Sequence, residues 1–426
     1  MLSLIGPVKQ YCKPLPSEVQ DETWYQEEAI LKVVDGFLIV ELFRNDSSPR
    51  SLVADGKRVV ELVKNFARIP SLERLSLEDN LIERIDSSVF EGLPRLVYLS
   101  LARNRIKYLK IDSFLGLNEL EILNLNHNSL NHLTETLILR HNSLKFLSDS
   151  INDDALPKLT RLYLQHNLLD LNYGINNNQK KFQLCHRNLK ELYLSNNFIR
   201  SFDPNSWNPE QCLNSLTQLY LDKNKIFDFI IGDMPLEALS LNENDLSYIP
   251  AINFHLKFLS LSKNHIKYLR NFTNDNKSIL RLVLSHNDIA TSLIYAKFQA
   301  LSSLEHLALD NNCLKSIPDG IFTNLTSLQS LDLTGNSIYD VAPRAFSHLP
   351  SLRTLYFGHN KLSSFPGRES FGQSNLQYLD FSNNKVQKIS NIQARFIPEL
   401  KYLKVTGNPI KRIDPNAIFK NFKDIN

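Results

Sequence analysis

Histidine, serine and acidic side chains are numerous in this chain, and together they could supply a nucleophile, a general base or metal ligands. Their spacing does not support any of these uses. No G-x-S-x-G, H-E-x-x-H, G-x-x-x-x-G-K-[ST] or G-x-G-x-x-G segment occurs, so the turns and paired ligands that hydrolases, metallopeptidases and nucleotide-binding enzymes need are missing. We therefore predict no catalytic residues, no cofactor and no metal site.

A set of tyrosines has the chemistry of a binding surface instead. Tyr163, Tyr193 and Tyr220 occupy the same position in three similar segments, R-L-Y-L-Q, E-L-Y-L-S and Q-L-Y-L-D. Tyrosine joins an apolar ring to a hydrogen-bonding hydroxyl and is enriched at interface hot spots. The alternative is that tyrosine simply suits exposed strand positions. We expect a ligand- or protein-binding surface of these tyrosines with Arg161, Gln165, Glu191, Gln218 and Asp222.

Histidine recurs directly before an asparagine, at His127, His141, His166, His286 and His359. Imidazole titrates near pH 6.5, so a row of histidines could sense acid conditions. The alternative, that histidine only fills this position, stays open.

The pattern L-x-x-L-x-L-x-x-N supplies the elements that must position these side chains. It is complete at Leu72, Leu75, Leu77 and Asn80. The alternation L-x-L places apolar side chains on one face of a short strand, and stacked copies bury that face in a continuous core. The asparagine amide can donate and accept, so stacked asparagines form a buried hydrogen-bonded ladder. The closing asparagines are Asn80, Asn104, Asn128, Asn142, Asn167, Asn197, Asn224, Asn244, Asn264, Asn287, Asn312, Asn336, Asn360, Asn384 and Asn408.

This repeat resembles the leucine-rich repeat family. The return segments carry Phe90, Phe114, Phe322 and Phe346 six residues before the next leucine, with a 24-residue period. That arrangement resembles the "typical" subfamily, which includes Toll-like receptor ectodomains and chaoptin-like adhesion proteins. The resemblance implies an α/β repeat solenoid, a curved leucine-rich-repeat horseshoe with a parallel β-sheet on its concave face, and an extracellular location.

Residues 1–71 fit the repeat poorly and predict an irregular N-terminal capping region, before a solenoid of about 15 repeats over residues 72–426. Within this cap, a degenerate copy of the repeat is expected at Phe37, Val40, Leu42 and Asn45. A helix is expected over Lys57–Phe66.

The two ends lack familiar features of this family. No signal peptide and no cysteine-rich cap is recognisable, and a sixteenth strand only begins, at Ile425. We therefore expect the chain to be a fragment or the product of a truncated gene model.

The spacing of the asparagines is irregular in the middle of the chain. Asn128 and Asn142 lie 14 residues apart, too close for a full coil, so we expect a distorted coil near Leu133–Thr134. Two long repeats follow, with their extra residues at 172–188 and 201–215. Insertions in solenoids form loops on one face, which is often the binding face.

Two cysteines lie in these insertions. Cys185 precedes Leu189 by four residues, and Cys212 precedes Leu216 by four. Equivalent positions in adjacent repeats are about one strand spacing apart, ~4.8 Å, which suits a disulfide. We predict a Cys185–Cys212 bridge, and the alternative is two free thiols of a cytosolic protein.

Four N-x-[ST] sequons occur. Asn45 is expected to be buried as a ladder residue, which leaves Asn271, Asn276 and Asn324 as predicted glycosylation sites.

The composition limits the classes of partner. The 426 residues include 72 Leu and 44 Asn but only 13 Gly, and the net charge is +3 with acids and bases mixed, so a nucleic-acid partner is not indicated. No apolar run is long enough to span a membrane. With the family resemblance, we predict non-enzymatic recognition of a protein, a glycan or a second copy of the chain. The concave face of an extracellular or cell-surface ectodomain, innate-immune receptor-like or cell-adhesion-like, would bind this ligand. The alternative is a cytoplasmic scaffold that binds a partner protein.

Overall fold

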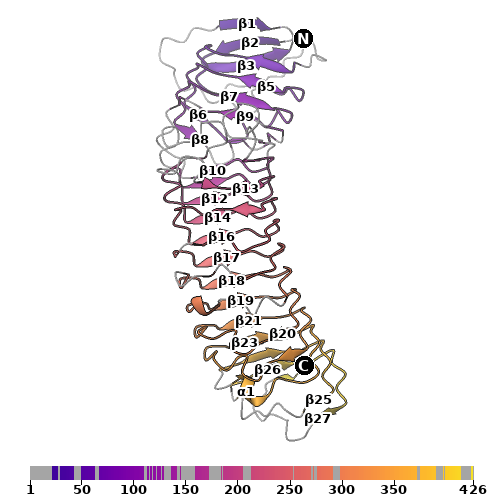
Figure 1. The fold of residues 1–426 in the computed structure, drawn as a ribbon. Coiled ribbons are helices and arrows are strands. Elements are labelled where there is room, and N and C mark those ends of the chain that lie inside the picture. Colours follow the sequence, from indigo (N-terminus) through magenta and orange to yellow (C-terminus); the bar gives the residue numbers. More distant parts are fainter. Residues whose placement is uncertain are drawn as a thin grey trace. The chain divides into compact units, whose positions relative to one another are not determined.

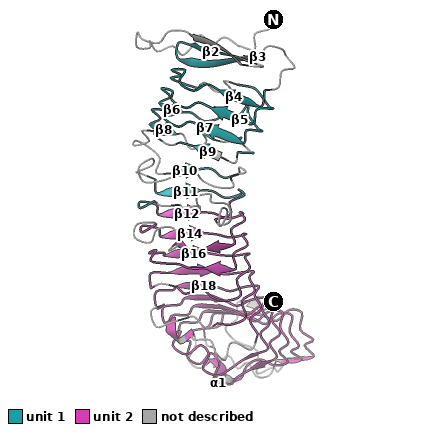
Figure 2. Cartoon of the chain, turned by 45° about the horizontal axis from the view of Figure 1, so that its top comes forward, with its two compact units in different colours: residues 1–168, 184–188 teal, residues 169–183, 189–426 magenta. Residues whose placement is uncertain are grey.

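The structure is a computed structural model, and its chain divides into two compact units. Unit 1 comprises residues 1–168 and 184–188, and unit 2 comprises residues 169–183 and 189–426 (Figure 2). The described residues are 22–26, 29–42, 49–62, 67–109, 113–114, 116–117, 119–120, 122–125, 127–128, 136–141, 144, 159–171, 184, 186–204, 213–252, 254–269, 272, 276–290, 298–371, 375–389, 397, 399–413 and 424–425.

Unit 1 begins with an antiparallel sheet of three strands. Asp35 and Gly36 join the second strand to the third with φ angles of 50° and 79°, as a tight hairpin turn requires. The degenerate repeat predicted at Phe37, Val40 and Leu42 is therefore wrong, because these residues pair antiparallel with the preceding strand. Asn45 of that prediction lies outside the described residues. The strands are β1 (Glu22–Gln26), β2 (Ala29–Val34) and β3 (Phe37–Leu42) (Figure 1).

The first parallel coil starts later, at β4 (Ser51–Val53). Its buried Leu52 is the partner of Leu75 on the next strand, and Lys57 stands where other coils have asparagine. The helix predicted over Lys57–Phe66 is not formed at residues 57–62, which instead bridge to β3 through Glu61. Residues 63–66 lie outside the described part.

The parallel strands of unit 1 form two groups. The first sheet has the order β4, β5 (Arg74–Ser76), β7 (Tyr98–Ser100) and β9 (Ile122–Asn124), with β6 (Arg84–Ile85) paired to β8 (Tyr108–Leu109) on the return side. The strands β10 (Thr136–Ile138) and β11 (Arg161–Tyr163) pair with each other, and β10 is not in the sheet that contains β9. The described strands are therefore interrupted where the 14-residue step falls in the sequence, as expected for a distorted coil, while Leu133 and Thr134 themselves lie outside the described residues.

Unit 2 is a regular parallel stack. In each pair of adjacent strands the central leucines are direct partners, for example Leu219 with Leu239 and Leu331 with Leu355. The strands, in order across the sheet, are β12 (Glu191–Tyr193), β14 (Gln218–Tyr220), β16 (Ala238–Ser240), β17 (Phe258–Ser260), β18 (Arg281–Val283), β19 (His306–Ala308), β21 (Ser330–Asp332), β23 (Thr354–Tyr356), β24 (Tyr378–Asp380), β26 (Tyr402–Lys404) and β28 (Asp424–Ile425) (Figure 1). A strand is present close to the position predicted from Ile425, but it begins at Asp424, and Ile425 is the partner of the central Leu403 of β26.

The return side of unit 2 is compact and mostly irregular. Phe322 and Phe346 are buried, as the return pattern predicts, and their ring centroids lie 6.0 Å apart in a stack. The short elements on this side are the pairs β13 (Ser201–Phe202) with β15 (Asp228–Phe229), β20 (Ser316–Ile317) with β22 (Asp340–Val341) and β25 (Lys388–Ile389) with β27 (Arg412–Ile413), the 3-10 helix Phe298–Ala300, and α1 (Arg368–Phe371).

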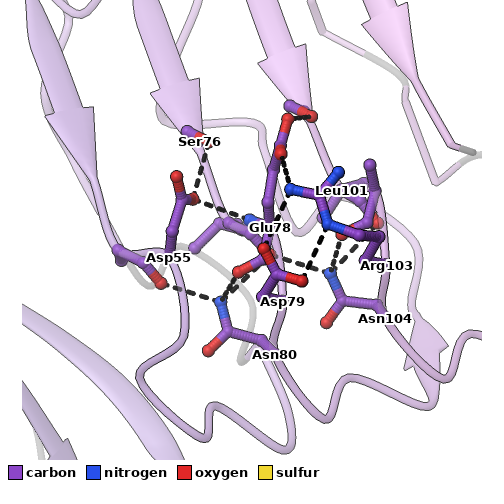
Figure 3. Close-up of polar contacts among 12 residues, drawn as sticks. Asp55, Ser76, Glu78, Asp79, Asn80, Leu101, Arg103 and Asn104 are labelled. Carbon is purple, nitrogen blue, oxygen red and sulfur yellow. Dashed lines mark hydrogen bonds and ion pairs between the residues drawn. The ribbon is translucent and has the colours of Figure 1, made fainter.

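The asparagine ladder forms as predicted at the described positions, while Asn142 lies outside the described residues. Asn264 Nδ2 donates to the carbonyl of Leu241 in the preceding coil at 2.9 Å and to that of Leu261 in its own coil at 3.0 Å, while its Oδ1 accepts the N–H of Leu246 at 3.0 Å. Asn80 and Asn104 bond in the same way in unit 1 (Figure 3). These amides satisfy backbone groups that would otherwise be buried without partners.

Candidate functional site

Two residues flank the central leucine of each strand on the exposed face of the sheet, and in β7, β16, β17 and β24 the second of them is buried. In β12 and β14 the central leucine is fully buried, whereas the residues on either side of it are partly exposed. We call the side of each sheet that carries these flanking residues the exposed sheet face. A regular column of such positions is rigid, because each strand is hydrogen-bonded to the next.

Two of the predicted binding tyrosines are brought together on this face of unit 2. Tyr193 and Tyr220 are direct partners on β12 and β14, and their rings stack with centroids 4.8 Å apart and planes inclined by 3°. The Tyr193 hydroxyl donates to Glu191 at 3.0 Å, and the Tyr220 hydroxyl donates to Gln218 at 3.2 Å. Both hydroxyls are thus held by the residue at the start of their own strand.

The electrostatic surroundings keep Tyr220 neutral. Burial raises the pKa of Tyr220 above its ordinary value, and the carboxylates of Glu191 and Asp222 raise it further. Tyr220 therefore presents an uncharged ring whose hydroxyl remains a hydrogen-bond donor beyond neutral pH.

The other predicted binding residues have different positions. Arg161, Tyr163 and Gln165 lie on or directly after β11, on the exposed sheet face of unit 1. All three are partly exposed, and the side-chain amide oxygen of Gln165 is buried without a hydrogen-bond partner among the described residues. Whether they bind a ligand stays a prediction.

Asp222 has a structural role that the sequence interpretation did not identify. Its Oδ1 accepts the hydroxyl of Ser240 at 2.6 Å and the N–H of Asn242 at 2.8 Å, both in the next coil. Asn242 Oδ1 repeats these two bonds, to Ser260 Oγ at 2.7 Å and to the N–H of Ser262 at 2.7 Å. Asp222 thus belongs to a second ladder and stabilises the coil contact, which leaves Tyr193 and Tyr220 as the more available part of the predicted surface.

The same arrangement is visible in unit 1 (Figure 3). Asp55 Oδ1 accepts the hydroxyl of Ser76 at 2.6 Å and the N–H of Glu78 at 2.8 Å. Arg103 then pairs with both Glu78 and Asp79, and its hydrogen bond to Asp79 lowers the pKa of that carboxyl. The sequence signal for this ladder is an acid or amide directly after the third leucine, with serine between the leucines of the next copy.

The histidines occupy a special backbone position. His127, His141, His166, His286 and His359 are all exposed and have φ between 55° and 59°. Asparagine, aspartate and histidine tolerate this left-handed conformation better than most residues. The backbone therefore accounts for histidine at this position without a pH-sensing role. Within unit 1, the His141 and His166 rings stack 4.3 Å apart.

The predicted modification sites have mixed outcomes. Asn276 is fully buried and its amide donates to the Ile252 carbonyl at 3.1 Å, so the prediction of a glycan there is wrong for the folded chain. Asn324 is exposed and stays a predicted site. Cys185, Cys212 and Asn271 lie outside the described residues, and Cys313 is exposed with a free thiol.

Within the described part, no group of three or more His, Cys, Asp and Glu side chains is arranged to hold a metal ion. The described helices are all too short or too polar to cross a membrane.

Three repeat models match the chain. They are described as "Leucine rich repeat", over residues 70–130, 281–338 and 302–362, "Leucine Rich repeats (2 copies)", over residues 374–418, and "Leucine Rich Repeat", over residues 188–209. These matches include the strands β12, β18 to β26 and β5 to β9, so the repeat pattern and the stacked coils coincide.

Curated proteins and one solved structure are similar to the chain. Podocan-like protein 1 of Mus musculus is 29% identical over 186 residues, which are 41% of this chain and 31% of that protein. Lumican of Mus musculus is 31% identical over 204 residues, which are 40% of this chain and 57% of lumican. The chain therefore spans only part of the length of these relatives. The plant peptide hormone receptor RGFR1, solved in complex with RGF2, has a TM-score of 0.51 and 22% identity over 81% of this chain and 59% of its own, which shows likeness of fold.

Proposed function

Because this chain belongs to the leucine-rich repeat family, we propose that it is a non-enzymatic recognition protein whose exposed sheet face binds a protein ligand. The observation that carries the proposal is the stacked pair Tyr193–Tyr220 on β12 and β14. Tyrosine is enriched at interface hot spots because it combines apolar contact area with a hydrogen-bonding hydroxyl.

The hydrogen bonds of the two tyrosine hydroxyls favour binding. Glu191 and Gln218 hold the two hydroxyls, so the side chains are ordered before a ligand arrives. An ordered surface loses little conformational entropy on association, which leaves more of the contact energy for affinity. Tyr163, Arg161 and Gln165 form a separate proposed binding group on the exposed sheet face of unit 1.

We place this recognition outside the cell or at its surface. The similar protein lumican is an extracellular matrix protein. The predicted bridge Cys185–Cys212 and the predicted glycan sites Asn271 and Asn324 fit the same location. Protein from its native source should carry glycan on at least one of these asparagines and should resist thiol labelling at both cysteines. Unmodified asparagines with two labelled cysteines would favour the cytoplasmic scaffold instead.

The binding test is a pull-down from native tissue with the full chain. Replacing Tyr163, Tyr193 and Tyr220 together by alanine should reduce capture of the ligand by about thirtyfold or more, since one hot-spot tyrosine contributes about 2 kcal/mol. A matched control is Tyr339→Ala, because this tyrosine is 61% exposed and lies just before β22 on the return side.

Two results decide the outcome. If the control variant retains the ligand while the triple variant loses it, at equal thermal stability, the ligand binds at the predicted face. If both variants recover the same proteins in the same amounts, the tyrosines are not the binding site.

A further inference from the structure

A second group of tyrosines lies on the exposed sheet face of unit 2, on the strands β23, β24 and β26. Asp332, Tyr356 and Asp380 end the consecutive strands β21, β23 and β24 and are direct partners across the sheet. Tyr378 and Tyr402 begin β24 and β26 and are also partners. We call these five residues, with Asp310 just after β19, the acidic tyrosine surface.

The tyrosine rings of this surface are tilted and do not stack in parallel. Tyr356 and Tyr378 have centroids 5.4 Å apart with planes inclined by 50°, and Tyr378 and Tyr402 are 6.4 Å apart at 41°. Tyr402 is 43% exposed. Tilted rings leave part of each face uncovered, and the face of an aromatic ring carries the negative potential that attracts a cation.

One carboxylate of this surface is neutralised and another is not. Asp380 is buried, and it accepts the N–H and hydroxyl of Ser382 and the ammonium of Lys404, the last at 3.1 Å. Asp332 accepts the N–H of Thr334 at 2.9 Å, and no cation among the described residues forms an ion pair with it. Burial raises the pKa of Asp332 above its ordinary value, and the charges of Asp310 and Asp380 raise it further.

Asp310 adds to the same negative charge. Its Oδ1 accepts the hydroxyl of Ser285, and its Oδ2 accepts the amide of Asn311 at 2.7 Å, so both of these donors are neutral. Asp310 and Asp332 thus carry negative charge with no ion-pair partner among the described residues, whereas Asp380 pairs with Lys404. A hollow of about 250 Å³, lined in part by Gln329, Arg353 and Gln377, lies at the start of the same strands.

We infer that the acidic tyrosine surface binds an extended, arginine-containing segment of a partner protein. Charge complementarity selects a cationic occupant, and the tyrosines select arginine over lysine, because a planar guanidinium can stack on a ring while it pairs with a carboxylate. Asp332 and Asp380 lie two strands apart, roughly 9–10 Å. Residues three apart in a polyproline II segment are separated by about 9 Å, so successive arginines of an R-x-x-R segment match the two-strand spacing of this surface.

The test uses a fluorescein-labelled peptide with arginine at every third position and proline elsewhere, and fluorescence anisotropy with the full chain. A peptide with glutamate in place of arginine, and one with lysine, are the matched probes. The account predicts binding in the order arginine, lysine, glutamate, and weaker binding as the salt concentration rises. Equal binding of the arginine and glutamate peptides overturns the inference.

Variants then place the peptide on this surface. Asp332→Asn should weaken binding of the arginine peptide about tenfold, because a charge-assisted hydrogen bond is lost. Asp340→Asn is the matched control, since it removes the same charge from the same coil, on β22, and should change nothing. Tyr378→Leu should weaken binding about threefold, whereas Tyr378→Phe keeps the ring and should retain it. Identical affinities of Asp332→Asn and Asp340→Asn overturn the inference.

Binding of the arginine peptide to the acidic tyrosine surface does not require the Tyr193–Tyr220 pair on β12 and β14. The double variant Tyr193→Ala/Tyr220→Ala should bind the arginine peptide with unchanged affinity. A loss of peptide binding in that variant would place the peptide elsewhere and overturn the inference, whatever the fate of the native ligand.

Discussion

Two regions of unit 2 carry tyrosines on the same sheet in the same register, yet they present different chemistry. In the first, Tyr193 and Tyr220 are direct partners, and their rings are parallel at 4.8 Å. In the second, Tyr356 stands between Asp332 and Asp380, and its ring meets the tilted ring of Tyr378 from the neighbouring column.

The difference lies in what each tyrosine meets one strand away. Tyr193 and Tyr220 stack in parallel, so each ring hides one face of the other. Tyrosine alternating with aspartate keeps its ring tilted and surrounds it with negative charge. The residues in the neighbouring coils therefore determine whether the tyrosines form a neutral contact surface or a cation-binding one. The buried leucines beneath them are the same in both regions.

The largest expected effect on stability comes from replacing a buried leucine, since both tyrosine regions lie over the same leucine core. Leu219→Ala, under the first region, and Leu331→Ala, under the second, should each lower the free energy of unfolding by about 2–5 kcal/mol, because each leaves a cavity in a fully buried position. Urea denaturation measures both. Leu280→Ala is the control, since this leucine is 38% exposed and should cost less than about 1 kcal/mol. An equally small effect at Leu331 would show that the second region is not supported by a packed core.

A smaller effect is expected from the asparagine ladder that connects the coils. Asn264→Ala leaves the N–H of Leu246 and the carbonyl of Leu241 buried without their side-chain partner, which should lower the free energy of unfolding by about 1–3 kcal/mol. Asn375→Ala is the comparison, because that exposed amide bonds only to the Pro350 carbonyl. If the two variants have the same free energy of unfolding, the buried asparagine ladder does not stabilise the stacked coils.

The difference between the two tyrosine pairs can be sharpened with double-mutant cycles. The coupling free energy of Tyr193 with Tyr220 should be about 0.5–1.5 kcal/mol, the range found for well-stacked aromatic pairs. Tyr356 with Tyr378 should couple more weakly, because those rings are inclined by 50°. Chemical denaturation of the single and double variants gives both values, and a stronger coupling in the tilted pair would reverse the comparison.

The smallest effect concerns the charge at Asp332. Its pKa is raised above the ordinary value of 3.8, so its contribution to stability is fully present below that pH and is lost as pH rises through the folded-state pKa. Asp332→Asn does not suffer this loss. The variant should therefore melt at a higher temperature relative to wild type at pH about 7 than at pH about 3. A difference that stays constant between the two conditions would contradict the raised pKa.

The fold was predictable because its main signal is repeated so often. Leu72, Leu75, Leu77 and Asn80 define a strand, a core contact and a ladder bond, and the later copies that the structure describes in full have the same physical consequence. The antiparallel sheet at the N-terminus was missed, since alternation along β3 is the same whether its partner is parallel or antiparallel. The Asp35–Gly36 pair is a hairpin signal that could have identified it.

The site was less predictable, because it depends on what stands one coil away. The pairing of Tyr193 with Tyr220 follows from the repeat, but the capture of Asp222 by Ser240 and Asn242 requires the register of the next coil. Tyr378 and Tyr402 begin their strands, and the sequence alone does not show that their rings lie beside Tyr356 and the aspartates. Asn276 shows the same limit, since nothing local in a sequon reveals that its amide is buried.

The most direct test of the account measures the two regions of unit 2 side by side. The ligand recovered from native tissue and the arginine peptide are each titrated against wild type, Tyr193→Ala/Tyr220→Ala and Asp332→Asn. The account predicts that the double variant loses the native ligand and retains the peptide, while Asp332→Asn loses the peptide and retains the native ligand. Loss of both by one variant, or of neither by either variant, would contradict two separate recognition regions on one sheet.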